Sequence, residues 1–292
     1  MGRTAFSLLL VLVLSFPPGA RTATRTEAGD QGQFTTIDVP AGSGTQVRGI
    51  NARGDMVGFY TSSSGTQRGF LLDQGSYTDI VHPSAVSGTR AFGINVQGDV
   101  VGSYTDGDFR THGFLLHDGS YADIDVPGAT TTTVALGINA QGDVVGFSID
   151  ATGSHGFRLH DGAFESINRP GAVTTSAAGI NAEGDIVGSY TNGTGTHGFL
   201  LNDAGYTDID HPNAVFGTLP FGIDPQGNIV GAYLDAAFTS HGFVLRNGEY
   251  TDVDYPGSFR TAAFGMNERG DIVGFYVTFT AEAHGFLLSK AG

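Results

Sequence analysis

The feature that most constrains this chain is a short unit that recurs until its end. The tripeptide Gly-Ile-Asn, or a close variant, opens each copy at intervals of 42 to 44 residues, at Gly49, Gly93, Gly137, Gly179, Gly222 and Gly265. Each copy continues with a turn glycine, then two apolar residues and another glycine, then Gly-Phe. A fixed period of this length indicates that one small structural unit packs against copies of itself. The fold is therefore predicted to be a repeat architecture.

The copy from 89 to 127 is typical of four short strands joined by turns. We expect these strands over Thr89–Asn95, Asp99–Tyr104, His112–Leu116 and Tyr121–Asp125. Asn-x-x-Gly joins the first two strands and Asp-Gly joins the last two, and both sequences favour tight hairpins because Asn and Gly accept positive φ. No segment of the repeats has a sustained helical period. The sequence therefore predicts an all-β chain of antiparallel units.

Such a unit is too small to bury two apolar faces alone. Each four-stranded sheet needs a neighbour on both sides, which is the arrangement of a β-propeller. The glycines fit this arrangement, since Gly93, Gly102 and Gly113 leave gaps that bulky residues of the next copy could fill. We therefore expect the copies to pack face to face around a ring.

The two ends of the chain favour a closed ring. The last copy stops after its third strand, at 284–288, and the segment Phe34–Pro40 matches the fourth strand of the other copies. We predict an all-β, six-bladed β-propeller with four strands per blade, in which Gln33–Asp38 pairs beside Gly285–Leu288 and completes the last blade. Closure would remove both sheet edges, which otherwise invite aggregation. The alternative is an open β-solenoid with unpaired strands at both ends.

The beginning of the chain differs from the repeats. Arg3 supplies a positive start, residues 5–16 are almost all small or apolar, and Pro17 and Pro18 end any helix. This layout is typical of a secretory signal peptide and is too short for a comfortable membrane span. We expect residues 1–23 to be a signal peptide, 24–33 a linker and 34–292 a single propeller domain. The protein would then be secreted, either extracellular or periplasmic.

The repeat motif also resembles a known family. The pattern Gly-Ile-Asn-x-x-Gly-Asp-Val-Val-Gly, followed by His-Gly-Phe-Leu-Leu, is similar to that of the HAF repeat family of probable extracellular proteins. That family is named for His-Ala-Phe, and here Gly replaces the middle Ala in every copy. The resemblance covers residues 34–288. It implies secretion and a repeat fold, and it implies no particular activity.

Composition excludes several classes of function. The chain has 29 acidic and 14 basic residues, a formal net charge of -15, which disfavours binding to nucleic acid. It has no Cys, so disulfides, thiolate metal sites and Cys nucleophiles are excluded. Nucleophile-elbow, metalloprotease and phosphate-loop motifs are missing. We expect a monomer with no cofactor, no metal and no recognisable catalytic residue.

One histidine per copy precedes Gly-Phe in the expected third strand. These residues are His112, His155, His197, His241 and His284. A ring would hold them far apart, whereas a metal ion needs its ligands within about 2 Å. We interpret each histidine as a hydrogen bond that ties a loop to its sheet. The Asn and Asp residues of the first turn are interpreted as turn formers, with calcium binding as the alternative.

Positions at which the copies disagree are the best candidates for a single site, because constant positions serve the fold. In a propeller the longer links of each copy, such as 105–111 and 127–132, share one face, which we call the loop face. Arginines depart from the repeat pattern on or near this face, in copies that would be neighbours in a ring: Arg48, Arg68, Arg90, Arg110 and Arg260. Phe109 lies in the same sector, as do Phe259 and Phe279. We predict a ligand site made of these five arginines and Phe109.

Three functions fit this pattern. Arginine offers a planar fork that holds a carboxylate or sulfate with two hydrogen bonds, so the first hypothesis is a secreted module that binds an anionic or sugar-like ligand, such as an acidic glycan or a protein, on the loop face. The second is an extracellular polysaccharide lyase or hydrolase, for which Asp106, Asp108 and His82 are the only titratable candidates near the sector. The third is a structural or adhesive surface protein without a small-molecule site.

Overall fold

The computed structural model describes residues 32–40 and 42–290, so the expected signal peptide and most of the expected linker lie outside the described residues. This part contains twenty-four β-strands, β1 to β24, joined by turns and bends. None of its residues is helical, and it contains no helix long and apolar enough to cross a membrane. The prediction of an all-β chain is confirmed.

The strands pair in antiparallel runs of four, and each run is one copy of the repeat. The first strands of the runs are β2 (Ser43–Ile50), β6 (Gly88–Ile94), β10 (Thr132–Ile138), β14 (Thr174–Ile180), β18 (Gly217–Ile223) and β22 (Arg260–Met266). The second strands are β3 (Met56–Thr61), β7 (Val100–Thr105), β11 (Val144–Ile149), β15 (Ile186–Thr191), β19 (Ile229–Leu234) and β23 (Ile272–Val277). The four strands expected from residues 89 to 125 are present, with ends that differ by one residue.

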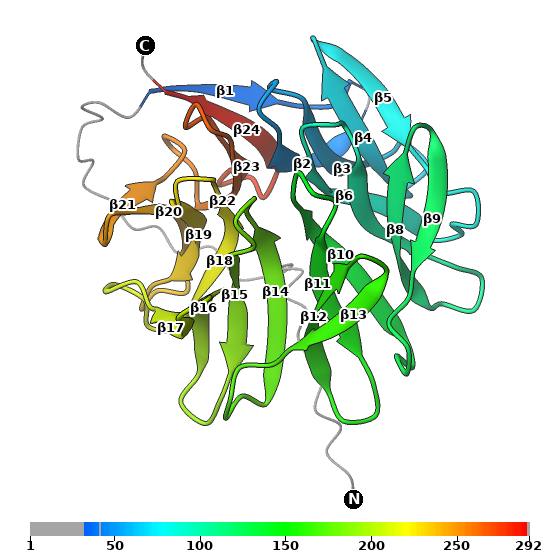
Figure 1. Ribbon diagram of the computed structural model, residues 1–292. Coiled ribbons are helices and arrows are strands. Elements are labelled where there is room, and N and C mark those ends of the chain that lie inside the picture. Colours follow the sequence, from blue (N-terminus) through cyan, green and yellow to red (C-terminus); the bar gives the residue numbers. More distant parts are fainter. Residues whose placement is uncertain (1–31, 41, 291–292) are drawn as a thin grey trace, which may run out of the picture.

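The remaining strands complete the runs. The third strands are β4 (Gln67–Asp73), β8 (Thr111–His117), β12 (Ser154–His160), β16 (Thr196–Asn202), β20 (Ser240–Arg246) and β24 (Ala283–Ser289). The fourth strands are β5 (Ser76–Ile80), β9 (Ser120–Ile124), β13 (Ala163–Ile167), β17 (Gly205–Ile209) and β21 (Glu249–Val253), and β1 (Gln33–Ile37) supplies the fourth strand of the last run. Figure 1 shows the first strands nearest a common centre, with the fourth strands farther out.

The β1 strand joins the two ends of the described chain. It pairs antiparallel with β24, with Phe34 opposite Leu288 and Ile37 opposite Gly285, so the expected pairing is present. The Phe34 ring packs edge-on against Phe286 at 5.4 Å between ring centroids. An aromatic residue on the fourth strand packs the same way in other runs, as Tyr121 packs on Phe114 at 5.5 Å. The strand therefore occupies the place that a fourth strand occupies elsewhere.

Six glycines, one on each first strand, allow these strands to approach one another, and we call them the ring glycines. A Cβ added to Gly93 would lie 3.0 Å from the carbonyl oxygen of Leu136, on the next first strand. The same contact is made in turn by Gly49, Gly137, Gly179, Gly222 and Gly265, and the contact of Gly265 is with the backbone of Arg48 and Gly49. Each first strand thus packs against the next, and β22 packs against β2. Only glycine leaves enough room for backbones this close.

The gap at Gly102 is filled differently from our expectation. A Cβ at this position would overlap the carbonyl oxygen of Arg90 and lie 2.7 Å from the Phe114 ring, and both residues belong to the same run of strands as Gly102. The prediction that a neighbouring copy fills this gap is therefore wrong. The pairing of β6 with β7 is bulged beside this glycine, between Ala91 and Gly93. At Gly93 the neighbouring copy does fill the gap, as predicted.

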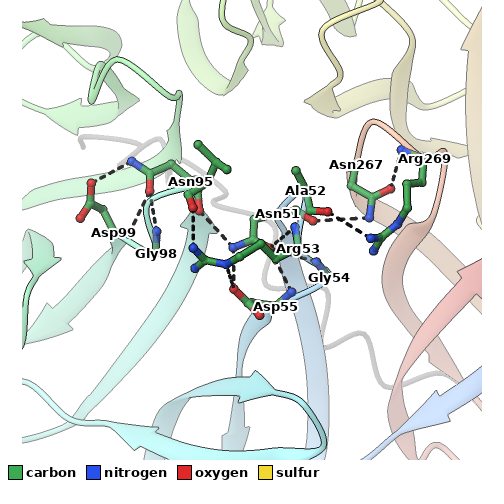
Figure 2. Close-up of polar contacts among 11 residues, drawn as sticks. Asn51, Ala52, Arg53, Gly54, Asp55, Asn95, Gly98, Asp99, Asn267 and Arg269 are labelled. Carbon is green, nitrogen blue, oxygen red and sulfur yellow. Dashed lines mark hydrogen bonds and ion pairs between the residues drawn. The ribbon is translucent and has the colours of Figure 1, made fainter.

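Asparagines of the first turn tie adjacent runs together. The Asn51 side chain accepts hydrogen bonds from the backbone N–H groups of Arg53, Gly54 and Asp55, which confirms its role as a turn former. Its Nδ2 also donates to the carbonyl oxygen of Asn95 in the next run at 3.1 Å. Asn267 donates to the carbonyl oxygen of Asn51 at 3.4 Å in the same manner. Figure 2 shows both links, so the last run is joined to the first as the first is to the second.

Candidate functional site

Exposed apolar side chains gather on the loop face. Backbone hydrogen bonds hold each long link against its neighbour, such as Val86 N–H to the Thr105 carbonyl at 2.8 Å and Phe259 N–H to the Val277 carbonyl at 2.7 Å. Eight exposed large apolar residues of these links are Val86, Phe109, Val173, Val215, Phe216, Phe238, Phe259 and Phe279. We call these eight residues the apolar crown. Exposed apolar side chains that contact one another often mark a binding surface, whereas scattered ones are common on soluble proteins.

Two pairs of rings in the apolar crown contact each other. Phe216 stacks on Phe238 with centroids 3.8 Å apart, and Phe259 lies 5.9 Å from Phe279. Each pair joins the link before a first strand to the link between the second and third strands of the same run. The rings therefore form small apolar platforms on adjacent runs. Aromatic side chains offer a large contact area with little loss of rotamer freedom, which suits a binding surface.

Backbone strain marks two members of the apolar crown. Phe109 and Phe238 both have φ of 61°, a left-handed conformation that bulky residues rarely adopt. Phe109 is also 79% exposed, so packing in the folded chain does not repay the strain. Asn or Gly would fit these turn positions at lower cost. Ala281 has φ of 65° at the equivalent position of the link between β23 and β24, so the conformation belongs to the turn. What distinguishes Phe109 and Phe238 is the large aromatic side chain placed at this position, which is a candidate for a role outside folding.

Sequence reasoning identified only part of the apolar crown. It named Phe109, Phe259 and Phe279 but missed Phe216 and Phe238. The sequence contained a pattern that could have identified Phe238, because Phe238 follows Asp235 by three residues, as Phe109 follows Asp106. These two aspartates accept hydrogen bonds from backbone N–H groups of their own loops, which gives both loops the same shape.

The predicted arginines do not form one cluster, and Arg48 lies at the centre of the molecule. Its Cζ atom lies 3.5 Å from the centroid of Phe264, 5.2 Å from Phe92 and 6.0 Å from Phe221. These rings belong to β22, β6 and β18, which surround the common centre of Figure 1. Burial, together with the positive charge of nearby Arg90, lowers the pKa of Arg48 to about 9. The structure thus brings Arg48 and Arg90 together.

Arg90 and Arg260 lie on the strands that flank β2. Arg90 donates from Nε to the side-chain oxygen of Gln67 at 2.5 Å, and burial lowers its pKa. Arg260 is only 6% exposed, its Nε has no hydrogen-bond partner, and burial lowers its pKa as well. Strand β2 contacts both β6 and β22. Arg260 is therefore a buried cation and Arg90 a half-buried one, and both lie on strands next to β2 rather than on the outer surface.

Arg68, Arg110 and Phe109 lie elsewhere. Arg68 forms an ion pair with Asp79 of its own run, at 2.7 Å, and that partner satisfies its charge. Arg110 is exposed in the link between β7 and β8, where its backbone N–H binds Asp106. Phe109 precedes it in the same link. The predicted set therefore divides into a central group, a paired residue at the rim and a loop-face group.

The titratable residues considered for catalysis have structural contacts. His82 is 5% exposed and stacks on Tyr104 with ring centroids 3.7 Å apart, and burial lowers its pKa. Asp106 holds its loop through the hydrogen bonds described above and accepts another from His112 at 3.1 Å. Within residues 32–40 and 42–290, no group of three or more His, Asp or Glu side chains is placed to hold a metal ion.

The histidines of the third strands make the expected hydrogen bonds. His112 binds Asp125 through Nδ1 at 2.9 Å, and Asp125 lies at the end of the fourth strand of the same run. The same contact recurs from His155 to Asn168, His197 to Asp210, His241 to Asp254 and His284 to Asp38. The last of these contacts links β24 to the segment that follows β1. The interpretation of these histidines as ties between loop and sheet is confirmed.

Comparison with known proteins supports the fold. No family model matches the chain, so the HAF resemblance stays a prediction, and no curated protein matches it either. Among solved structures, AofleA from Arthrobotrys oligospora is similar with a TM-score of 0.57 at 14% identity, covering 90% of this chain and 88% of that one. A gluconolactonase-like protein reaches 0.54 at 17%, covering 89% and 94%. The fucose-specific lectin from Aleuria aurantia reaches 0.51 at 9%, covering 86% and 93%. The chain has an all-β, propeller-like fold.

Proposed function

We propose that the protein is a secreted binding module, built as a six-bladed β-propeller closed by β1, which recognises a sugar-like or anionic ligand on its loop face. The observation that carries the proposal is the exposed and strained aromatic surface of the apolar crown. Ring faces of this kind pack on the apolar faces of sugars, while Arg110 beside Phe109 supplies a charge for an acidic group.

Two further observations support the proposal. The cyclic contacts of the ring glycines, together with the Asn267–Asn51 link, are what a closed ring of six sheets requires. The fucose-specific lectin from Aleuria aurantia has a similar fold, and one structure of that lectin contains Fucα1-6GlcNAc. Identity with this lectin is too low to transfer its ligand. The likeness still favours a glycan as the first ligand to test.

A glycan screen with a strain-relieving variant tests this function. The double change Phe109→Asn plus Phe238→Asn removes two rings and places Asn at positions with φ of 61°, which Asn tolerates better. We expect binding to fucosylated or acidic glycans to fall at least about tenfold, while the melting temperature stays equal or rises. Gln74→Asn is the matched control, because Gln74 has φ of 46° in the link between β4 and β5, at the opposite end of the strands.

Each outcome separates the candidate functions. Glycan binding by the wild type and by Gln74→Asn, with loss in the double variant, supports the loop-face site. Equal binding by the double variant would show that the ligand site lies elsewhere. No binding to any glycan or polyanion by the wild type would favour a structural or adhesive role.

A further inference from the structure

One layer at the centre of the molecule contains a single cation, Arg48, among apolar side chains. The residues that precede the ring glycines follow one another around the centre, because each ring glycine packs against the next of these residues: Arg48, Phe92, Leu136, Ala178, Phe221 and Phe264. Arg48 is only half-buried, as is Phe221 on β18, so solvent reaches this layer. A small molecule that entered here would meet apolar walls and a single guanidinium group.

The contact with Phe264 determines how Arg48 can bind. At 3.5 Å between Cζ and the ring centroid, the guanidinium plane must lie roughly parallel to the ring. A nitrogen directed at the ring would lie about 1.3 Å closer and would clash. The flat face of the guanidinium therefore packs on the Phe264 ring, and its N–H groups point sideways, parallel to that ring. Those N–H groups have the planar fork geometry that matches a carboxylate.

No protein carboxylate neutralises this charge. Five arginines of the chain have an aspartate partner, namely Arg53, Arg68, Arg158, Arg169 and Arg269. Among the described residues, Arg110 and Arg246 form no ion pair, but both are exposed to solvent. Within the described residues, Arg48, Arg90 and Arg260 form no ion pair with any carboxylate. A buried charge without a partner is costly, and a bound anion would offset that cost. In a chain with a net charge of -15, unpaired cations at one place are a specific feature.

The three unpaired arginines lie at different depths. Arg260 is the first residue of β22 and Arg90 is the third residue of β6. Arg48 on β2 corresponds to Phe92, the fifth residue of β6, because each precedes the ring glycine of its strand. Because each first strand runs away from the loop face with a rise of about 3.3 Å per residue, successive arginines lie about 7 Å deeper. Arg260, with its unpaired Nε, is nearest the loop face and Arg48 is the deepest. An anion entering from the loop face would pass from one cation to the next.

We propose that Arg48 is the anchor of a binding site for a small carboxylate that carries an apolar body. The carboxylate accepts two hydrogen bonds from the Arg48 fork, and the apolar body packs against Phe92 and Phe221. Arg90 and Arg260 attract the anion toward this layer. The site is separate from the apolar crown and does not depend on the loop-face ligand.

Calorimetric titration with benzoate tests the site, using the full chain and three variants. Arg48→Met keeps a long apolar side chain over Phe264 and removes the fork, so benzoate affinity should fall at least about tenfold. Arg48→Lys keeps the charge without the planar fork and should also bind more weakly. Arg246→Met is the matched control, since Arg246 is exposed and forms no ion pair within the described residues, and its affinity should change less than about twofold.

Neutral and loop-face controls complete the test. Benzyl alcohol has the same ring without the charge and should not compete with benzoate. The variant with Phe109→Asn plus Phe238→Asn should bind benzoate like the wild type. The benzoate result therefore does not depend on whether the loop face binds a glycan. Melting curves should show Arg48→Met folded and at least as stable as the wild type. Unchanged benzoate affinity in Arg48→Met, competition by benzyl alcohol, or no benzoate binding by the wild type would each overturn the proposal.

Discussion

Adding one methyl group at a ring glycine should destabilise the protein measurably. In Gly137→Ala the new Cβ would lie 2.9 Å from the carbonyl oxygen of Ala178, 3.1 Å from a methyl carbon of Val145 and 3.2 Å from Cα of Gly179. Two of these atoms belong to the backbone of β14, which cannot move without shifting the next contact around the centre. Overpacking of this kind costs about 1–3 kcal/mol.

Part of that cost is recovered in the unfolded state. Glycine in a strand is less favourable than alanine by roughly 0.5–1 kcal/mol, because an unfolded chain with glycine has more conformational entropy, which is lost on folding. The net expectation for Gly137→Ala is therefore a loss of unfolding free energy of about 1 kcal/mol, within a range of about 0–2.5 kcal/mol. Gly193→Ala is the control, since nothing lies within 4 Å of its added Cβ and its φ is ordinary, and it should be neutral or slightly stabilising.

Denaturant unfolding of both variants measures this difference. The midpoint of Gly137→Ala should fall while that of Gly193→Ala stays the same or rises, at an unchanged slope of free energy against denaturant. Equal midpoints for the two variants would refute the reasoning, because they would show that the first strands have room between them. The packing around the centre would then be looser than the glycine contacts indicate.

Two further predictions follow from other contacts. Gly102→Val should cost about 3 kcal/mol or more by denaturant unfolding, since its Cβ overlaps the Arg90 carbonyl and the Phe114 ring; a neutral result would contradict this packing. The hydrogen bond to Asp254 at 2.7 Å raises the pKa of His241 above its ordinary value of about 6.5, despite partial burial. The contribution of the His241–Asp254 contact to folding stability is therefore present below about pH 6.5 and is lost as the pH rises through the raised pKa. His241→Gln should therefore cost more stability near pH 5.5 than near pH 8.5, and an equal cost at both pH values would contradict the assignment.

Local features of the fold could be predicted from the repeat alone. Alternating residues and the Asn and Gly turns located β6 to β9 to within one residue, because strands and hairpins depend on short-range spacing. The roles of Asn51 and His112 followed for the same reason, since their partners lie four and thirteen residues away. The pairing of β1 with β24 could be predicted because a missing fourth strand at one end matched a spare one at the other.

Which atoms fill each glycine gap could be predicted only in part. The neighbouring copy fills the gap at Gly93, as expected, whereas the gap at Gly102 is filled by a carbonyl and a ring of its own run. The five arginines looked equivalent as departures from the repeat. Arg68 meets Asp79 on the paired strand of its own run, whereas Arg48 meets an aromatic ring of another run, and the second contact depends on how the sheets face one another.

The most direct test of the account is a cross-link between β1 and β24, since both proposed sites depend on a closed ring. Thr35 and Leu287 are opposite each other in the two strands, and the chain has no Cys of its own. Opposed residues of antiparallel strands have Cβ atoms about 4.5–5.5 Å apart, which is close to disulfide distance. Thr35→Cys with Leu287→Cys should oxidise to an intrachain disulfide and raise the melting temperature, whereas Thr35→Cys with Leu115→Cys, the equivalent position on β8, should remain reduced. Failure of the first pair to cross-link within one chain, or equal cross-linking of both pairs, would contradict closure of the ring by β1.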